Sequence, residues 1–153
     1  MQFLLPIATV IIILDQITKY IIRNTLEYNE IWMPWDWLMP YARIVHWQNT
    51  GAAFGIGQGM NLFFVILAFF VMVMIIYYFP HIPREDFFLR LALSLQLGGA
   101  GGNLVDRLLQ GHVTDFISVG SFPVFNIADS SITIGVGVLI LGMWLEGRNQ
   151  IHE

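Results

Sequence analysis

Two aspartates, Asp115 and Asp129, have the residue type and the setting to carry out chemistry. Both stand beside long apolar stretches, where carboxylates are costly and are usually retained for function. Two carboxylates that share a small site cannot both ionise easily, so one pKa rises and the pair holds a proton. The ionised member can then activate a water while the protonated member polarises a peptide carbonyl, which is aspartic-protease chemistry.

The spacing of the two aspartates does not by itself bring them together. They are 129 − 115 = 14 residues apart, and Gly120 and Pro123 in the intervening segment permit a turn that returns the chain. Their proximity is therefore a hypothesis at this level.

Other polar residues are expected to converge on the same side of the molecule. Asp15 and Lys19 are four residues apart on one helical face, so they can pair. A purely structural network is the alternative, in which Arg107 neutralises Asp106 or Asp115. Replacing such a network by apolar packing would cost little, which favours a functional role for the set. The set comprises Asp15, Lys19, Asn49, Asn103, Asp106, Arg107 and Asn126.

Two other functions are alternatives to an aspartic protease. One is a serine peptidase, in which Lys19 activates Ser130 or Ser131. Asp129 and Ser130 are nevertheless good N-cap types at the expected start of a helix, and we favour that role for the serine. The other alternative is a small membrane transporter or proton-conducting protein with buried aspartates. Transporters usually have repeated halves, and no internal repeat is visible in the sequence.

The composition indicates a membrane protein. Of the 153 residues, 56% are hydrophobic and only 12% are charged, compared with about 25% charged residues in globular domains. The net charge of −4 provides no basic patch, so nucleic acid is not expected as a partner. There are no cysteines, and the four histidines are scattered, so neither a metal site nor a cofactor is expected. The histidines are His46, His81, His112 and His152.

Four apolar stretches are each about as long as the hydrocarbon core requires. They lie at about residues 3–22, 62–79, 87–109 and 130–145, and they predict one integral membrane domain over residues 1–153. The short polar connection 81–86 predicts a hairpin between the second and third stretches. The segment 24–60 is rich in Trp and Tyr, which favour the membrane interface, and its residues 42–47 alternate as strands do.

The sequence resembles bacterial lipoprotein signal peptidase, also called signal peptidase II, over essentially its whole length. Five blocks in order carry the resemblance, and none departs from the family pattern. They are Asp15–Lys19, Asn49–Phe54, Gly98–Arg107, Val113–Phe116 and Phe125–Asp129.

The resemblance implies an aspartic endopeptidase with four transmembrane helices, and with a small extracytoplasmic β-platform and an interfacial helix in the first loop. Asp115 and Asp129 match the family's catalytic pair. The enzyme would remove the signal peptide from diacylglyceryl-modified prolipoproteins, cutting before the lipidated cysteine. The positions that would bind substrate or support the site are Asp15, Lys19, Asn49, Gly51, Asn103, Asp106, Arg107 and Asn126.

The resemblance also implies a location and partners. It places the protein in the bacterial cytoplasmic (inner) membrane as a multi-pass protein in contact with lipid, and we expect a monomer. Both termini would be cytoplasmic and the active site would lie toward the outer face. Inhibition by globomycin is expected. Charge counts on the two sides are nearly balanced, so they assign no orientation.

Overall fold

The computed structural model of the chain describes residues 3–151, so His152 and the ends of the expected domain 1–153 lie outside the described residues. Four long helices alternate with three strands and two short 3-10 helices. In chain order these are α1 (Leu4–Thr25), β1 (Ile31–Trp32), β2 (Ala42–Asn49), η1 (Ala53–Gly55), α2 (Asn61–Tyr78), η2 (Phe79–His81), α3 (Phe87–Gln110), β3 (Val113–Val119) and α4 (Ile127–Ile151).

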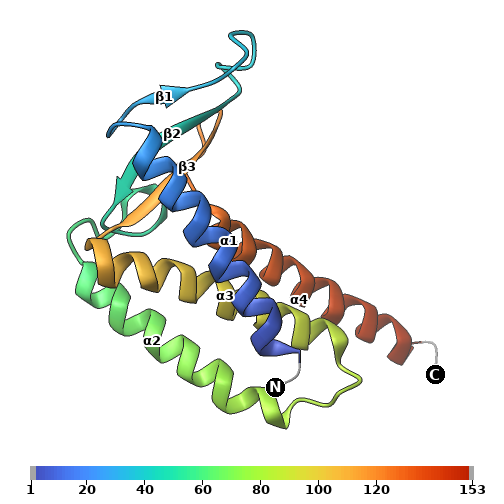
Figure 1. Cartoon of the computed structure of the whole chain (residues 1–153). Helices are drawn as coiled ribbons and strands as arrows, with labels where there is room; N and C mark the ends of the chain where they lie inside the picture. Colours follow the sequence, from blue (N-terminus) through green and yellow to red (C-terminus); the bar gives the residue numbers. More distant parts are fainter. Residues whose placement is uncertain (1–2, 152–153) are drawn as a thin grey trace.

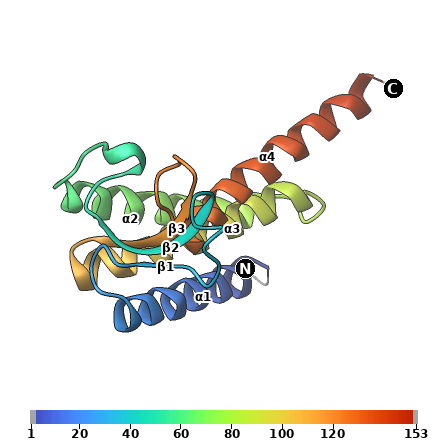
Figure 2. The ribbon, with the colours of Figure 1, turned by 90° about the horizontal axis from the view of Figure 1, so that it is seen from above.

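The helices form a bundle with the sheet at one end (Figure 1). The first turn of α1, the α2–α3 connection and the last turns of α4 lie at the other end. Seen from above, the strands lie over the bundle and α4 runs outward from beneath them (Figure 2). The connection between α2 and α3 is short, as expected from residues 81–86, and it makes these two helices a hairpin.

Within residues 3–151, three helices are long and apolar enough to cross a membrane: Leu4–Thr25, Asn61–His81 and Ile127–Arg148. The third expected span is also a helix, but α3 carries more polar residues. Its position explains this composition, because α3 contacts each of the other three helices. Its polar groups therefore find partners within the protein.

Glycines in the Gly98–Gly102 run let α3 approach two neighbours closely. A Cβ on Gly98 would stand 2.8 Å from a side-chain atom of Ile11 in α1. A Cβ on Gly102 would stand 2.6 Å from Oδ2 of Asp15, and one on Gly99 would meet the backbone of α4. Small residues have this effect in membrane bundles generally.

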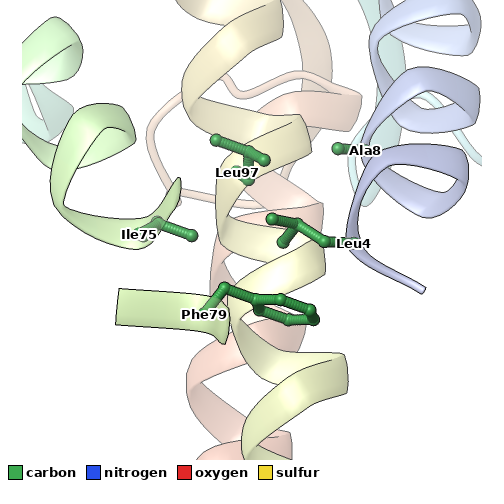
Figure 3. Packing of buried hydrophobic residues seen from close by; sticks show 5 residues of the cluster. All are labelled: Leu4, Ala8, Ile75, Phe79 and Leu97. Carbon is green, nitrogen blue, oxygen red and sulfur yellow. The ribbon is translucent and has the colours of Figure 1, made fainter. Parts of the chain in front are cut away.

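The end of the bundle away from the sheet is held by apolar packing. Phe79 and Leu4 are fully buried there, and Leu97 from α3 packs with them (Figure 3). Ile75 and Ala8 complete the cluster. Burial of each large side chain contributes roughly 1.5–3 kcal/mol relative to exposure in water, although the gain is smaller where lipid is the alternative.

The sheet is antiparallel, in the order β1-β2-β3. The expectation of strands at residues 42–47 is confirmed by β2. The sheet is not confined to the first loop, however, because β3 comes from the segment between α3 and α4. Between the pairs Ile44–Ile117 and Trp47–Asp115 the register shifts by one residue, which is a bulge in β2. The interfacial helix stays a prediction, since η1 is the helical element described between β2 and α2.

Candidate active site

Asp115 lies in β3, opposite Trp47 of β2, and its side chain is 1% exposed. Each of its carboxylate oxygens accepts a hydrogen bond from an asparagine amide. Nδ2 of Asn126 donates to Oδ1 over 2.6 Å, and Nδ2 of Asn49 donates to Oδ2 over 3.0 Å. Neutral amides therefore hold this carboxylate in place.

Asp129 lies in the first turn of α4, which begins at Ile127, three residues before the expected start of the span. The expected capping by Asp129 and Ser130 is wrong, because Asn126 caps this helix. Oδ1 of Asn126 accepts from the amide of Asp129 over 2.9 Å, and Oδ2 of Asp129 accepts from the amide of Asn126 over 3.3 Å. This reciprocal pair is a capping box.

The same asparagine joins the two aspartates. Nδ2 of Asn126 reaches Asp115 while its backbone and Oδ1 hold Asp129. Asn103 supplies the second link, since its Nδ2 donates to Oδ1 of Asp129 over 2.8 Å. The proximity of the pair, open at the level of sequence, is therefore produced by β3, α3 and the start of α4 together.

Behind this pair lies an ion-paired cluster. Nζ of Lys19 stands 2.8 Å from Asp15 and 3.6 Å from Asp106, and all three side chains are buried. Arg23 pairs with the other oxygen of Asp106 over 3.0 Å. The i, i+4 pairing expected for Asp15 and Lys19 is confirmed. Lys19 also donates to Oδ1 of Asn103 over 2.9 Å, which connects the cluster to the aspartate pair.

The two aspartates of the cluster also bind backbone amides. Oδ1 of Asp15 accepts from the amide of Ala128 in the first turn of α4, over 3.0 Å. Such a carboxylate satisfies an unpaired helix donor and complements the helix dipole. Oδ2 of Asp106 accepts from the amide of Thr114 over 2.8 Å. The cluster thus positions the residues that flank both Asp115 and Asp129.

Among the described residues, Arg107 makes neither of the ion pairs, with Asp106 or with Asp115, that the structural-network alternative assigned to it. Its guanidinium donates to the carbonyl of Gly51 over 2.6 Å and to Oδ1 of Asn61 over 3.2 Å. It also lies over the ring of Phe64. The ion pairs of Asp106 go to Lys19 and Arg23 instead. Arg107 therefore ties the loop after β2 to the start of α2.

Gly51 and Asn49 shape that loop. A Cβ on Gly51 would collide with the carbonyl of Ile56, so only glycine fits. Oδ1 of Asn49 accepts from the amide of Gly51 over 2.9 Å while its Nδ2 binds Asp115. The loop and the carboxylate are thereby held by one side chain.

Burial, and after it the neighbouring charge of Asp129, raise the pKa of Asp115 to about 7. The hydrogen bonds from Asn49 and Asn126 act in the opposite direction, because they stabilise the ionised form. The pair therefore holds a proton near neutral pH, as two carboxylates in one site are expected to do.

Two cavities meet at the aspartate pair. The sheet cavity, about 460 Å³, is lined by Asp115 and by strand and loop residues including Arg43 and Ser118. The helix cavity, about 580 Å³, is lined by Asp129, Asn103 and apolar residues of α4 such as Ile132. Five residues border both: Asn49, Ala52, Phe122, Pro123 and Val124.

Four residues with a part in this arrangement were not singled out from the sequence. Arg23 continues the Asp15–Lys19 spacing by one more helical turn, and that signal could have identified it. Gln16, which donates to the carbonyl of Gly102 over 3.0 Å, lies inside a block that was recognised. Thr114 likewise lies inside a recognised block, Val113–Phe116. Asn61 acts through a contact between distant segments, for which the sequence holds no local signal.

The serine alternative finds no support in the geometry. Oγ of Ser130 donates to the carbonyl of Asn126, and Oγ of Ser131 donates to that of Leu95. The amine of Lys19 is occupied by the two aspartates and Asn103. Within residues 3–151, no group of three or more His, Asp or Glu side chains is placed to hold a metal ion.

Comparison with known proteins gives a consistent result. Residues 7–145 match the model of the family described as Signal peptidase (SPase) II. A protein of Shouchella clausii (strain KSM-K16) named lipoprotein signal peptidase is 43% identical over 145 residues, covering 94% of each chain. A protein of Staphylococcus aureus (strain bovine RF122 / ET3-1) with the same name is 37% identical, covering 94% of this chain and 89% of its own.

Two solved structures, each described as a bacterial membrane enzyme, share the fold. One superposes with a TM-score of 0.87 at 37% identity and covers 95% of this chain and 89% of its own. The other has a TM-score of 0.80 at 38% identity and covers 91% and 90%. With a family model that spans most of the residues and relatives of this similarity, the chain belongs to the signal peptidase II family.

Proposed function

We propose that this membrane enzyme is a lipoprotein signal peptidase of the aspartic type, with Asp115 and Asp129 as its catalytic pair. The observation that carries the proposal is the position of the pair. The two carboxylates stand where the sheet cavity and the helix cavity meet, and amides rather than cations hold them. A peptide that crosses from one cavity to the other would present a bond to both carboxylates.

The reaction needs one proton on the pair. The ionised carboxylate removes a proton from water, and the water oxygen attacks the carbonyl carbon of the peptide bond. The protonated carboxyl polarises the carbonyl oxygen and then protonates the leaving nitrogen as the carbon–nitrogen bond breaks. The products are a signal peptide ending in a carboxylate and a mature chain beginning with a free amine. A pKa of about 7 at Asp115 supports a singly protonated pair near neutral pH.

The other polar residues would orient the pair rather than react. Asn126, Asn103 and Asn49 donate to the carboxylates and fix their geometry. The ion-paired cluster of Asp15, Lys19 and Asp106 anchors the flanking backbone. Arg107 and Gly51 set the loop that borders both cavities. Such support holds reacting groups to within a fraction of an ångström of their working positions.

The substrate would be a prolipoprotein whose cysteine carries diacylglycerol, cut just before that cysteine. The relatives' name supports a lipoprotein precursor as substrate. The apolar helix cavity, bordered by Ile132 and Ile134 of α4, supports a segment delivered from within the membrane. Lipid chains already in the bilayer would add localisation and orientation rather than hydrophobic affinity. The transporter alternative is not favoured, since the family and the named relatives are peptidases.

We further propose four transmembrane helices, with α3 as the fourth, in the bacterial inner membrane. The start of α1 and the end of α4 both lie away from the sheet, which supports cytoplasmic termini (Figure 1). The site would then face outward. Exposed Trp32, Trp35 and Trp37 at the site end are of the type that favours the headgroup zone. A monomer in contact with lipid suits this arrangement.

Purified protein tests the proposal when it is incubated with a diacylglyceryl-modified prolipoprotein and with the unlipidated form of the same chain. We expect cleavage of the lipidated form before its cysteine, and inhibition by globomycin. Mass spectrometry of the products locates the cut. Equal cleavage of the unlipidated form, or a cut elsewhere, would contradict the substrate assignment.

A further inference from the structure

The sheet cavity is lined by a cationic residue that the reaction itself does not use. Arg43 lies in β2 and lines this cavity together with Ser118, its partner across β3. Within the described part of the chain, no carboxylate lies at ion-pair distance from its guanidinium, and no hydrogen bond from that group is formed. The other three cations near the site, Lys19, Arg23 and Arg107, are all engaged.

The two cavities differ in polarity, and this difference indicates which half of a peptide substrate each cavity binds. The helix cavity runs along the membrane-spanning α4, past Ile132 and Ile134, and suits the apolar signal peptide. The sheet cavity leads away from Asp115 over the strands and has polar residues along it, among them Gln58 and Ser121. The part of the substrate that follows the cleaved bond leaves the membrane. It therefore suits this more polar cavity.

The distance from Asp115 to Arg43 can be read from the strand register. Trp47 is opposite Asp115, and Arg43 lies four residues back along β2, one of which is taken up by the bulge. The remaining three steps span about 10 Å at roughly 3.3 Å per residue. An extended peptide that begins at the cut therefore reaches Arg43 at about its third residue.

We propose that Arg43 is a specificity-determining residue that favours an acidic side chain about three residues after the cleaved bond. A guanidinium in a partly enclosed cavity binds a carboxylate through charge-assisted hydrogen bonds, and it repels a lysine or arginine at the same place. This preference concerns the mature part of the prolipoprotein. It rests on the proposed function, because the cavity is assigned by the direction of the substrate.

The test uses lipidated prolipoproteins that are identical except for Asp, Asn or Lys at the third residue after the cut. The readout is the ratio of kcat/KM for the Asp substrate to that for the Lys substrate. We expect a ratio of about three to ten in the unmodified enzyme. Arg43→Gln should bring the ratio close to one, Arg43→Glu should invert it, and Arg43→Lys should preserve its direction.

Because the ratio is taken within each variant, a general change in activity cancels. Arg84→Gln is the matched control, since Arg84 is exposed in the α2–α3 connection at the far end of the bundle, and it should leave the ratio unchanged. A ratio near one in the unmodified enzyme overturns the proposal, as does a ratio that Arg43→Gln leaves intact. Either result, with cleavage still occurring before the cysteine, leaves the proposed peptidase function standing. Absence of cleavage of all three substrates would overturn both.

Discussion

Four aspartates lie near one another in the fold, and they have two different kinds of bonding partner. Asp15 and Asp106 are buried against Lys19 and Arg23, and they also bind backbone amides. Asp115 and Asp129 are held by asparagines and border open cavities. A cation beside a carboxylate favours the charged form over the neutral one. A carboxylate held by neutral amides beside another carboxylate can exchange a proton, which is what acid–base catalysis needs.

The bonding partner, and not the residue type, distinguishes the supporting aspartates from the proposed catalytic ones. Burial alone does not distinguish the two kinds, since Asp15, Asp106 and Asp115 are each at most 1% exposed. Removing one partner of a buried ion pair leaves an uncompensated charge and costs stability. Removing a catalytic carboxylate costs rate. Substitutions should therefore fall into two classes.

The largest effect is expected from the aspartate pair. Asp115→Asn and Asp129→Asn should each lower kcat by about a thousandfold or more, because general acid–base groups contribute on this scale. The folded state should survive, as measured by thermal unfolding in detergent. Asp36→Asn, an exposed aspartate of the β1–β2 loop, is the control. Near-normal turnover in either variant would remove the aspartic assignment.

The ion-paired cluster should show the opposite behaviour. Lys19→Met leaves Asp15 with an uncompensated buried charge, since Arg23 still pairs with Asp106, and should destabilise the protein by about 3–5 kcal/mol. The double variant Asp15→Asn with Lys19→Met should lose less than the sum of the single losses, because the two side chains interact directly. Additive losses in thermal or denaturant unfolding would show that the pair is not coupled.

Close packing against the cluster gives a smaller effect. Gly102→Ala places a Cβ 2.6 Å from Oδ2 of Asp15 and 3.3 Å from Cβ of Ala128, and overpacking of this kind costs about 1–3 kcal/mol. Gly137→Ala in α4 is the matched control, because its Cβ would meet nothing within 4 Å. If both variants unfold at the same temperature, α3 is not packed against α1 and α4 as closely as described.

The pH profile should identify the proton of the pair. Activity should fall about tenfold per pH unit above about 7, where the pair loses the proton that Asp115 holds. His112 is not expected to cause this change, since burial lowers the pKa of its ring below the usual value. His112→Gln should therefore retain the decline in kcat/KM above about pH 7. If the decline disappears in that variant, His112 rather than the aspartate pair causes it.

The same pKa has a consequence for stability with a definite sign. Asp115 binds its proton more tightly in the folded state, with a pKa of about 7, than at its ordinary value of 3.8. Stability is thus lost as the pH rises from about 4 to about 7, by at most about 4 kcal/mol at 1.36 kcal/mol per unit. Asp115→Asn lacks this loss, so its unfolding temperature should exceed that of the unmodified protein at pH 8.

The smallest effect is expected from Ser130→Ala. Its hydroxyl donates to the carbonyl of Asn126 within α4 and contacts no base, so turnover should change by less than about twofold. A loss comparable to that of the aspartate variants would revive the serine alternative. Ser130 follows Asp129 directly in α4, so the two variants compare a helix-bound hydroxyl with a carboxylate at the site.

Much of the molecule follows from the sequence by local rules. Apolar stretches of membrane length predicted all four helices, because hydrocarbon requires continuous helical hydrogen bonding and apolar side chains. The i, i+4 spacing predicted the Asp15–Lys19 pair, and the alternation at residues 42–47 predicted β2. The resemblance of five ordered blocks indicated the family. Each of these signals lies within one helix, one strand or one block of sequence.

The partners across elements were decided only by the tertiary structure. Asn126 lies next to Asp129 in the chain, yet its bond to Asp115 depends on β3 pairing with β2 and packing against the ends of α1 and α3. Arg107 is adjacent to Asp106, but the two side chains leave α3 in different directions and bind different segments. A sequence sets which groups are present and their local periodicity. Which of two aspartates meets a cation, and which meets an amide, is set by how distant segments pack.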